Sequence, residues 1–342
     1  MKAMITGATN ILAINVTRIG DTLLTTPSLR AIAAANPGAI LTFLGHPKRA
    51  EVMCHLPYVK KIGSVTKTRA PFLGHLGGKR HDFAFVFGFD EPLVAYALRV
   101  ARRVVAFRQK DDTLNQRLYR IADACDPMPM HAVDYLLKLP EAAGFPAMGR
   151  QLDYVVTPEE ADWARLELAR TLPKPCHGLI GLQVASFPTR AYRDWPLEHF
   201  IALTEHIRGA MPHAHFLIFG GSEEKARTEQ LARHLGQAAT LHAGQLTLRQ
   251  TGALMNEVDL YIGVDTGPTH LMGALHRPMV ALYHSHTPSR RLRPLDHPCA
   301  YIIDHPTPED GATPETKMAD ISVECVWRVV EQALAEHPPS VR

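Results

Sequence analysis

Residues 259–275 read DLYIGVDTGPTHLMGAL, a stretch that predicts a strand turning directly into a helix. Its apolar start, LYIGV, is typical of a buried strand, and the polar turn DTGPTH follows without a linker. Thr266 can cap the helix, Pro268 suits its first turn, and Gly267 leaves backbone N–H groups open to an anion. His270 would lie one turn further on. The stretch therefore predicts either a phosphate-binding turn or a simple helix cap with a structural histidine.

The same alternation of short apolar strands and helical stretches runs along most of the chain. It is typical of parallel sheets covered by helices on both faces. We expect two α/β lobes, joined by a Pro-rich connection around residues 146–177, with a cleft where ligands meet the carboxyl ends of the strands. The expected strands are 11–16, 39–44, 83–87, 179–184, 215–219, 260–264 and 278–283, and the expected helices include 21–35, 197–209, 223–235, 246–256 and 323–336.

Composition fits a folded protein of two domains. The chain has 342 residues, 46% of them hydrophobic, and a net charge of +3, which excludes an intrinsically disordered chain. It contains no transmembrane-length apolar run, and its first residues, MKAMITGATNILAINV, lack the apolar core and cleavage site of a secretory signal. The cysteines form no C-x-x-C pair, so we expect reduced thiols, no metal site and a cytoplasmic protein; they are Cys54, Cys125, Cys176, Cys299 and Cys325.

Positive charge is concentrated in the first half of the chain. Residues 46–120 contain 15 Lys and Arg against 6 Asp and Glu, so the rest of the chain is net negative. The excess suits a phosphorylated substrate or an anionic membrane surface, although a solvated basic surface would explain it too. No recognised nucleic-acid-binding motif accompanies the charge, so nucleic acid is not an expected partner.

A second candidate loop, Arg18-Ile19-Gly20-Asp21, directly follows the expected strand 11–16. Gly20 would let a ligand or another backbone segment come close. Asp21 is either a general base directed into the cleft or an N-cap whose carboxylate accepts from free backbone N–H groups. The loop by itself leaves both interpretations open.

A third candidate loop, TRAYRDWP at residues 189–196, follows the expected strand 179–184. Its hydroxyl and guanidinium groups lie just before a helix and suit a phosphate or pyrophosphate. Arg193 could neutralise a departing diphosphate as charge develops on it. The alternative is a surface loop that Trp195 anchors by packing.

Together, the three loops resemble family 9 glycosyltransferases, the lipopolysaccharide heptosyltransferases. The matching pieces are RIGDTLLTTPSLRAI, RDWPLEHF and DLYIGVDTGPTHLMGAL, and the most specific is the D-[ST]-G-x-x-H turn of the last. The resemblance implies an α/β protein of the GT-B fold, with two Rossmann-like α/β/α lobes and the active site in the interdomain cleft. It implies an acceptor-binding lobe over residues 1–160, a nucleotide-sugar-binding lobe over 177–320, and a final helix within 321–342 that packs back toward the first lobe.

The resemblance also implies the chemistry. Such an enzyme moves a heptose from ADP-L-glycero-D-manno-heptose to a lipid-A-linked inner-core sugar, inverts the anomeric centre, and uses neither a metal nor a cofactor. Asp21 would be the general base, and Arg193 would stabilise the leaving diphosphate where related enzymes often carry a lysine. The expected donor-binding residues are Gly20, Thr189, Arg190, Gln250, Asp265, Thr266, Gly267 and His270.

The acceptor of such an enzyme is anionic and lies in the inner leaflet, which gives the basic first half a purpose. We expect the first lobe to associate transiently, as a peripheral protein, with the cytoplasmic face of the inner membrane. The expected acceptor contacts are Lys48, Arg49, Lys60, Lys61 and Arg120.

Two features depart from the family pattern, and two alternatives stay open. Gln250 stands where a glutamate often binds the donor ribose, and the segment SHTPSRRLRPLDHP is unusually basic. The first alternative is a GT-B glycosyltransferase with another nucleotide sugar or acceptor, such as a capsule or an autotransporter protein. The second is a non-catalytic nucleotide-sugar-binding protein in which Asp21 is only a cap. A nicotinamide-dependent oxidoreductase is disfavoured because no G-x-G-x-x-G follows an expected strand.

Overall fold

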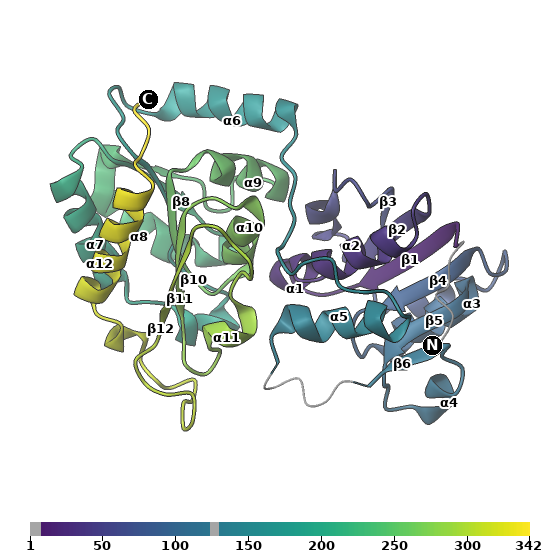
Figure 1. Ribbon diagram of the computed structural model, residues 1–342. Helices are drawn as coiled ribbons and strands as arrows, with labels where there is room; N and C mark the ends of the chain where they lie inside the picture. The colour runs from purple at the N-terminus through teal and green to yellow at the C-terminus, as the bar shows by residue number, and fades with distance from the viewer. Residues whose placement is uncertain (1–7, 124–129) are drawn as a thin grey trace. The chain divides into compact units, whose positions relative to one another are not determined.

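The computed structural model describes residues 8–123 and 130–342, and the chain divides into two compact units, Met1–Val155 and Val156–Arg342. Each unit has its own parallel sheet and its own buried core, which confirms the prediction of two α/β halves (Figure 1). The sequence placed residues up to 160 in the first lobe, whereas helix α6 (Pro158–Thr171) begins within the second unit and packs on α9 (Leu248–Glu257) there.

The first unit is built on a six-stranded parallel sheet in the order β3-β2-β1-β4-β5-β6. The direction of winding reverses between β1 and β4, which lie side by side with Ile11 opposite Phe83. In open α/β sheets, ligands bind beyond the carboxyl ends of the strands at such a reversal. The strands are β1 Asn10–Asn15, β2 Ile40–Gly45, β3 Lys61–Ser64, β4 His81–Val86, β5 Ala101–Phe107 and β6 Arg120–Ala122.

Apolar side chains pack on both faces of this sheet. Successive side chains of a strand point to opposite sides, so each strand contributes to both layers. Ala84 of β4 joins the apolar cluster beneath α3 (Glu91–Val100). Its neighbour Phe83 faces the other side, where its ring centroid lies 6.3 Å from that of Phe145. The other helical segments of the unit are α1 Ile19–Leu23, α2 Thr26–Ala35, η1 Ala50–Met53, η2 Ala70–Phe72, α4 Asp112–Asn115 and α5 Ala132–Ala142.

The single helix expected over residues 21–35 is wrong, because the segment forms two helices, α1 and α2. Pro27 lies in the first turn of α2. A proline is tolerated there because first-turn N–H groups have no intrahelical acceptor, whereas inside a continuous helix it would remove a hydrogen bond. The break leaves α1 as a short helix whose first turn directly follows the carboxyl end of β1.

The second unit repeats the same topology, with six parallel strands in the order β12-β11-β10-β7-β8-β9. Here the reversal falls between β7 and β10, which pair with Leu260 opposite Ile180. The loops that follow these two strands are therefore neighbours at one edge of the sheet. The strands are β7 Leu179–Gln183, β8 His215–Phe219, β9 Ala239–Leu241, β10 Leu260–Val264, β11 Met279–Tyr283 and β12 Ala300–Asp304.

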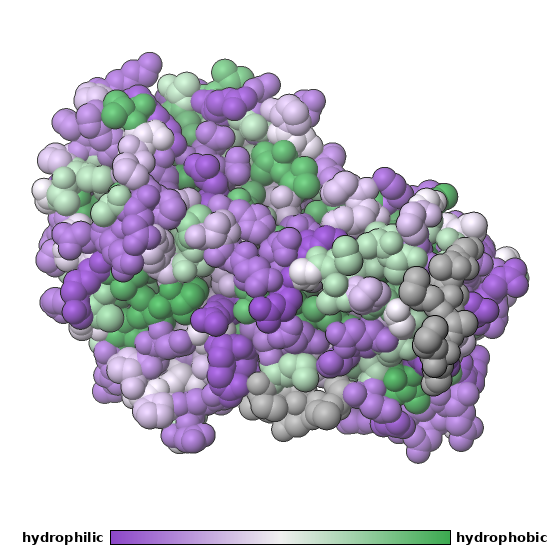
Figure 2. Space-filling view, in the orientation of Figure 1, coloured by the Kyte–Doolittle hydropathy of each residue, from purple (hydrophilic) through white to green (hydrophobic). Residues whose placement is uncertain are grey.

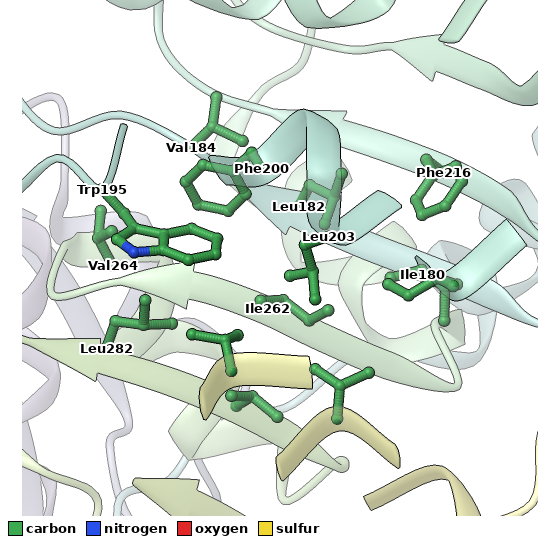
Figure 3. Packing of buried hydrophobic residues seen from close by; sticks show 14 of the residues in the cluster. Ile180, Leu182, Val184, Trp195, Phe200, Leu203, Phe216, Ile262, Val264 and Leu282 are labelled. Carbon is green, nitrogen blue, oxygen red and sulfur yellow. The ribbon is translucent and has the colours of Figure 1, made fainter. Parts of the chain in front are cut away.

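One face of the second sheet packs against α7 (Leu197–Ala210) and α12 (Val323–Glu336). In Figure 3, Leu182 and Ile262 of the sheet lie in this core together with Phe200 of α7. The remaining helical segments of the unit are η3 Pro188–Arg193, η4 Ser222–Glu224, α8 Lys225–Leu235, η5 Gly236–Ala238, α10 Gly267–Leu275, α11 Ser289–Leu292 and η6 Met318–Asp320.

The apolar face of α12 is used within the second unit. Val326, Val330 and Ala333 are buried in the core of that unit, and beyond the helix Val341 forms an isolated antiparallel bridge with His177, which precedes β7. A contact of the same helix with the first unit stays a prediction.

The surface of the described residues is largely polar. On the face shown in Figure 2, hydrophilic residues predominate, and hydrophobic ones form small separate groups. None of the described helices has the length and apolar character needed to cross a membrane. Cys54, Cys176, Cys299 and Cys325 are free thiols, and Cys125 lies outside the described residues.

Candidate functional site

The turn between β10 and α10 presents the positive end of a helix. Thr266 occupies the N-cap position in an extended conformation, but its side chain makes no capping hydrogen bond. Pro268 lies in the first turn, where its missing N–H costs nothing. The interpretation in which Thr266 caps the helix through its hydroxyl is therefore wrong. The first-turn N–H groups therefore stay free of this side chain, and together with the positive end of the helix dipole they favour an anion at this turn.

An ion pair joins this turn to the loop that follows β7. Arg193 Nη1 lies 2.7 Å from Asp265 Oδ2 and donates to the backbone carbonyl of Asp265 at 3.2 Å. The Asp265 side chain is only 1% exposed and that of Arg193 15%. On the other carboxylate oxygen, His270 Nε2 lies 3.6 Å from Oδ1. The structure thus brings together three of the predicted site residues at the reversal of the second sheet. Asp265 positions Arg193, and a direct contact between Asp265 and a donor stays a prediction.

Tyr192 gathers two guanidinium groups, a role that the sequence analysis missed. Its hydroxyl accepts from Arg190 Nη1 at 3.1 Å and from Arg193 Nε at 3.3 Å. Burial alone would raise the pKa of Tyr192, but the hydrogen bonds and charges of the two arginines outweigh burial and lower that pKa. The only sequence signal was the position of Tyr192 between the two arginines in TRAYRDWP.

The loop that carries Arg193 is locked at its base. Asp194 Oδ1 accepts from the backbone N–H and the hydroxyl of Ser186, at 2.7 and 2.6 Å. Burial raises the pKa of Asp194, while these hydrogen bonds and the charge of Arg227 oppose that rise. Trp195 is fully buried, and its indole N–H donates to the Ile321 carbonyl at 2.8 Å. Trp195 is therefore an anchor, as the alternative interpretation of this loop proposed, but the anchored loop also holds an arginine in an ion pair.

Two other donor-binding candidates have less support from their local geometry. Thr189 is exposed in η3. Gln250 takes part in a capping box at the start of α9. Its side-chain Oε1 accepts from the backbone N–H of Thr247 at 3.0 Å, and its backbone N–H donates to Thr247 Oγ1 at 3.1 Å. Gln250 thus has a structural role, and a contact with a donor ribose stays a prediction.

A buried histidine follows β11, directly before the basic segment that departs from the family pattern. His284 is fully buried, its Nδ1 accepts from the His286 N–H at 3.0 Å, and its Nε2 lies 2.8 Å from the Thr316 carbonyl oxygen. These contacts select the neutral form with hydrogen on Nε2, and burial lowers the pKa of His284 accordingly. Its ring centroid lies 5.1 Å from that of Tyr192. No sequence pattern singles out His284, because strand pairing rather than spacing brings it to the site.

In the first unit, Asp21 lies in the first turn of α1 with an exposed side chain. Arg18 occupies the N-cap position, so the interpretation of Asp21 as the N-cap is wrong. Among the described residues, no group donates a hydrogen bond to the Asp21 carboxylate. The turn itself is fixed, because Asn15 Nδ2 donates to the Asp21 carbonyl at 3.2 Å and Thr22 Oγ1 donates to the Arg18 carbonyl at 2.8 Å. Gly20 is buried beside it.

Of the acceptor candidates, Arg49 lies at the Asp21 loop. Its Nη1 donates to the carbonyl of Thr17, between β1 and α1, at 2.9 Å. Lys48 is its exposed neighbour in sequence. A basic group thus supports the same turn that carries the candidate base.

The other acceptor candidates are not gathered there. Lys61 begins β3 and Arg120 begins β6, which are the two opposite edges of the sheet. Five strand spacings separate these edges, or roughly 24 Å. Lys60 donates to the Pro57 carbonyl at 2.8 Å, and the guanidinium of Arg120 lies over the ring of Tyr119. One small anionic group cannot contact both edges.

Comparison with known proteins identifies the class of this architecture. A solved structure described as Escherichia coli ADP-heptose LPS heptosyltransferase II is similar to it, with a TM-score of 0.80 over 96% of this chain and 99% of that one, at 20% sequence identity. This likeness confirms the GT-B fold that the sequence predicts, whereas a site in an interdomain cleft stays a prediction.

The family follows from sequence comparison. The model of glycosyltransferase family 9 (heptosyltransferase) matches residues 101–315, and the chain belongs to this family. It is 26% identical over 247 residues to the lipopolysaccharide core heptosyltransferase OpsX of Haemophilus influenzae, a match over 69% of this chain and 65% of that protein. It is 22% identical over 281 residues to lipopolysaccharide heptosyltransferase 3 of Escherichia coli, covering 77% of this chain and 80% of that protein.

Proposed function

We propose that the protein transfers a heptose from ADP-L-glycero-D-manno-heptose to an inner-core lipopolysaccharide sugar, with inversion at the anomeric carbon. The observation that carries the proposal is the buried cluster of Arg193, Asp265 and His270 at the N-terminus of α10. Family membership and the names of the relatives support the donor and acceptor classes.

The second unit would hold the donor by its diphosphate. As the bond between the anomeric carbon and the phosphate oxygen breaks, that oxygen gains negative charge. Hydrogen-bond donors of the protein that are already in place stabilise this charge without reorganisation. Arg193, the first-turn N–H groups of α10 and His270 are such donors, and Asp265 keeps the guanidinium of Arg193 in position.

The first unit would supply the base. The acceptor hydroxyl oxygen attacks the anomeric carbon on the face opposite the leaving diphosphate, and its proton passes to the Asp21 carboxylate. Asp21 is free to accept that proton, because its side chain is exposed and no group in the described part of the chain donates a hydrogen bond to its carboxylate. General base catalysis of this kind contributes roughly 10²–10⁴-fold to the rate.

Nucleotide binding tests the donor. We expect ADP to bind in calorimetry, without added metal, more tightly than UDP, GDP or CDP, and Arg193→Gln to weaken that binding. Tighter binding of another nucleotide would retain the site and contradict the ADP-heptose donor. Failure of all four to bind would contradict the assignment of a nucleotide-sugar site.

A substitution separates the enzyme from a non-catalytic binding protein. In Asp21→Asn we expect turnover to fall by roughly 10²–10⁴-fold with donor affinity and unfolding unchanged. Asp112→Asn is the matched control, because Asp112 is also exposed in the first turn of a short helix, α4. Equal turnover in the two variants would refute the role of Asp21 as the base.

A further inference from the structure

Large apolar side chains are exposed in the loop that joins β3 to β4. The backbone of this loop is drawn in Figure 1. Phe72 is 82% exposed and Leu76 is 86% exposed, which makes them the two most exposed large apolar side chains among the described residues. Leu73, between them, is 41% exposed. Single exposed apolar residues are ordinary, but three within five residues form a group that calls for a partner. We refer to residues 66–80 as the 66–80 loop.

Two arginines fix the backbone of the 66–80 loop. Arg99 of α3 donates to the carbonyls of Ala70 and Leu73 at 2.6 and 2.8 Å. Arg80 donates to the carbonyl of Leu76 at 3.1 Å. The Arg99 bonds hold the loop backbone against α3, and the Arg80 bond lies within the loop, while the apolar side chains remain exposed. The loop therefore presents its apolar groups in a set conformation.

The charged residues in this stretch of the sequence have one sign. Between Glu51 and Asp82 the sequence contains no acidic residue. Lys67 of the 66–80 loop is paired with Asp90 at 2.6 Å, whereas Arg69 and Lys79 are exposed and form no ion pair among the residues that the structure describes. The Lys and Arg residues of this acid-free stretch are Lys60, Lys61, Lys67, Arg69, Lys79 and Arg80.

We infer that the 66–80 loop is a membrane contact, in which Phe72 and Leu76 enter the interfacial layer of an anionic bilayer and Arg69 and Lys79 bind lipid phosphates. Apolar groups flanked by lysine and arginine are the pattern of interfacial anchors. Protein interfaces instead deplete lysine at their cores, so this surface fits a lipid partner better than a protein partner. The inference goes beyond the proposed function and depends on neither the donor nor the base.

Vesicle binding by the full chain tests the apolar part. We expect co-sedimentation with vesicles of phosphatidylglycerol and phosphatidylethanolamine, and a partition coefficient about 100-fold lower for Phe72→Ser/Leu76→Ser. Leu166→Ser is the matched control, because Leu166 is 72% exposed in the second unit. Its partition coefficient should equal that of the parent protein. Because all three side chains are exposed, these variants should fold, which circular dichroism checks.

A charge variant tests the electrostatic part. Arg69→Gln/Lys79→Gln should bind these vesicles roughly tenfold more weakly at low salt and differ little from the parent at high salt, where surface charges are screened. Lys174→Gln/Arg208→Gln removes two exposed charges from the second unit and should leave binding unchanged.

Three results would overturn the inference. The first is equal vesicle binding by Phe72→Ser/Leu76→Ser and the parent protein. The second is equal binding of the parent to phosphatidylcholine and to anionic vesicles. The third is self-association of the parent, seen in sedimentation equilibrium and lost in the serine variant without a change in vesicle binding. Turnover of a delipidated acceptor sugar should be the same in the serine variant and the parent, so failure of the lipid inference remains distinguishable from failure of the proposed function.

Discussion

Removing the cation from the buried ion pair should cost more stability than removing the carboxylate. In Arg193→Gln, the Asp265 carboxylate, 1% exposed, loses the guanidinium 2.7 Å away and cannot reach water. Breaking a buried pair in this way costs about 3–5 kcal/mol. In Asp265→Asn, the guanidinium of Arg193 is 15% exposed and keeps its contact with Tyr192, so we expect a cost of about 1–2 kcal/mol.

Urea unfolding followed by tryptophan fluorescence measures both costs. The three tryptophans, Trp163, Trp195 and Trp327, all belong to the second unit, so their emission reports on the unit that contains the pair. The double variant Arg193→Gln/Asp265→Asn should be more stable than Arg193→Gln alone, with a coupling free energy of about 2–3 kcal/mol. Arg193→Lys is the control that keeps the charge, and it should lose less than Arg193→Gln.

A different order of stabilities would refute this reasoning. If Asp265→Asn lowers the free energy of unfolding as much as Arg193→Gln does, the Asp265 carboxylate must stabilise the fold by more than its charge. If the two single effects add without coupling, the side chains do not interact in solution. Either result would also remove the physical basis for Asp265 as the residue that positions Arg193.

Three further predictions concern the second unit. Burial lowers the pKa of His215 from 6.5 to about 4. Because the pKa in the folded state lies below that in the unfolded state, the stability is fully present above pH 6.5 and is lost as the pH falls toward 4. Lowering the pH from 7 to 5 should therefore cost about 2 kcal/mol in urea unfolding, and His215→Leu should remove this loss. Trp195→Phe leaves the buried Ile321 carbonyl without its 2.8 Å donor and should cost about 2 kcal/mol, measured by loss of circular dichroism in urea. Arg342→Gln removes the cation beside buried Asp259, whose carboxylate keeps its backbone donors, and should lower the same stability by about 3 kcal/mol.

The architecture was predictable where strands are buried on both faces. The apolar runs at residues 11–16 and 260–264 mark central strands, because a parallel sheet between two helical layers excludes polar residues from them. The edge strands β3 and β6 were missed because Lys61 and Arg120 lie at their starts and one side of each meets water. Central strand β5 was also missed, since its exposed Arg102 and Arg103 interrupt the apolar run.

The site was predictable only in part, because its residues come from different loops. The turn at 265–270 and the loop at 189–196 can each be recognised from the local spacing of their polar residues after a strand. The contact between Asp265 and Arg193 depends on β7 and β10 being neighbours, which no local pattern states. The same holds for His284, which reaches Tyr192 from the end of β11.

The two arginines of the 189–196 loop would let the site keep a positive charge for the diphosphate of the proposed donor. The charge of Arg193 is balanced by Asp265, so this pair alone would attract a dianionic leaving group weakly. Arg190 forms no ion pair within the part of the chain that the structure describes, and Tyr192 holds its guanidinium at the same phenol oxygen that Arg193 meets. Asp265 therefore fixes one cation in place without neutralising the site, because Arg190 adds the net charge that the departing diphosphate of the proposed reaction would require.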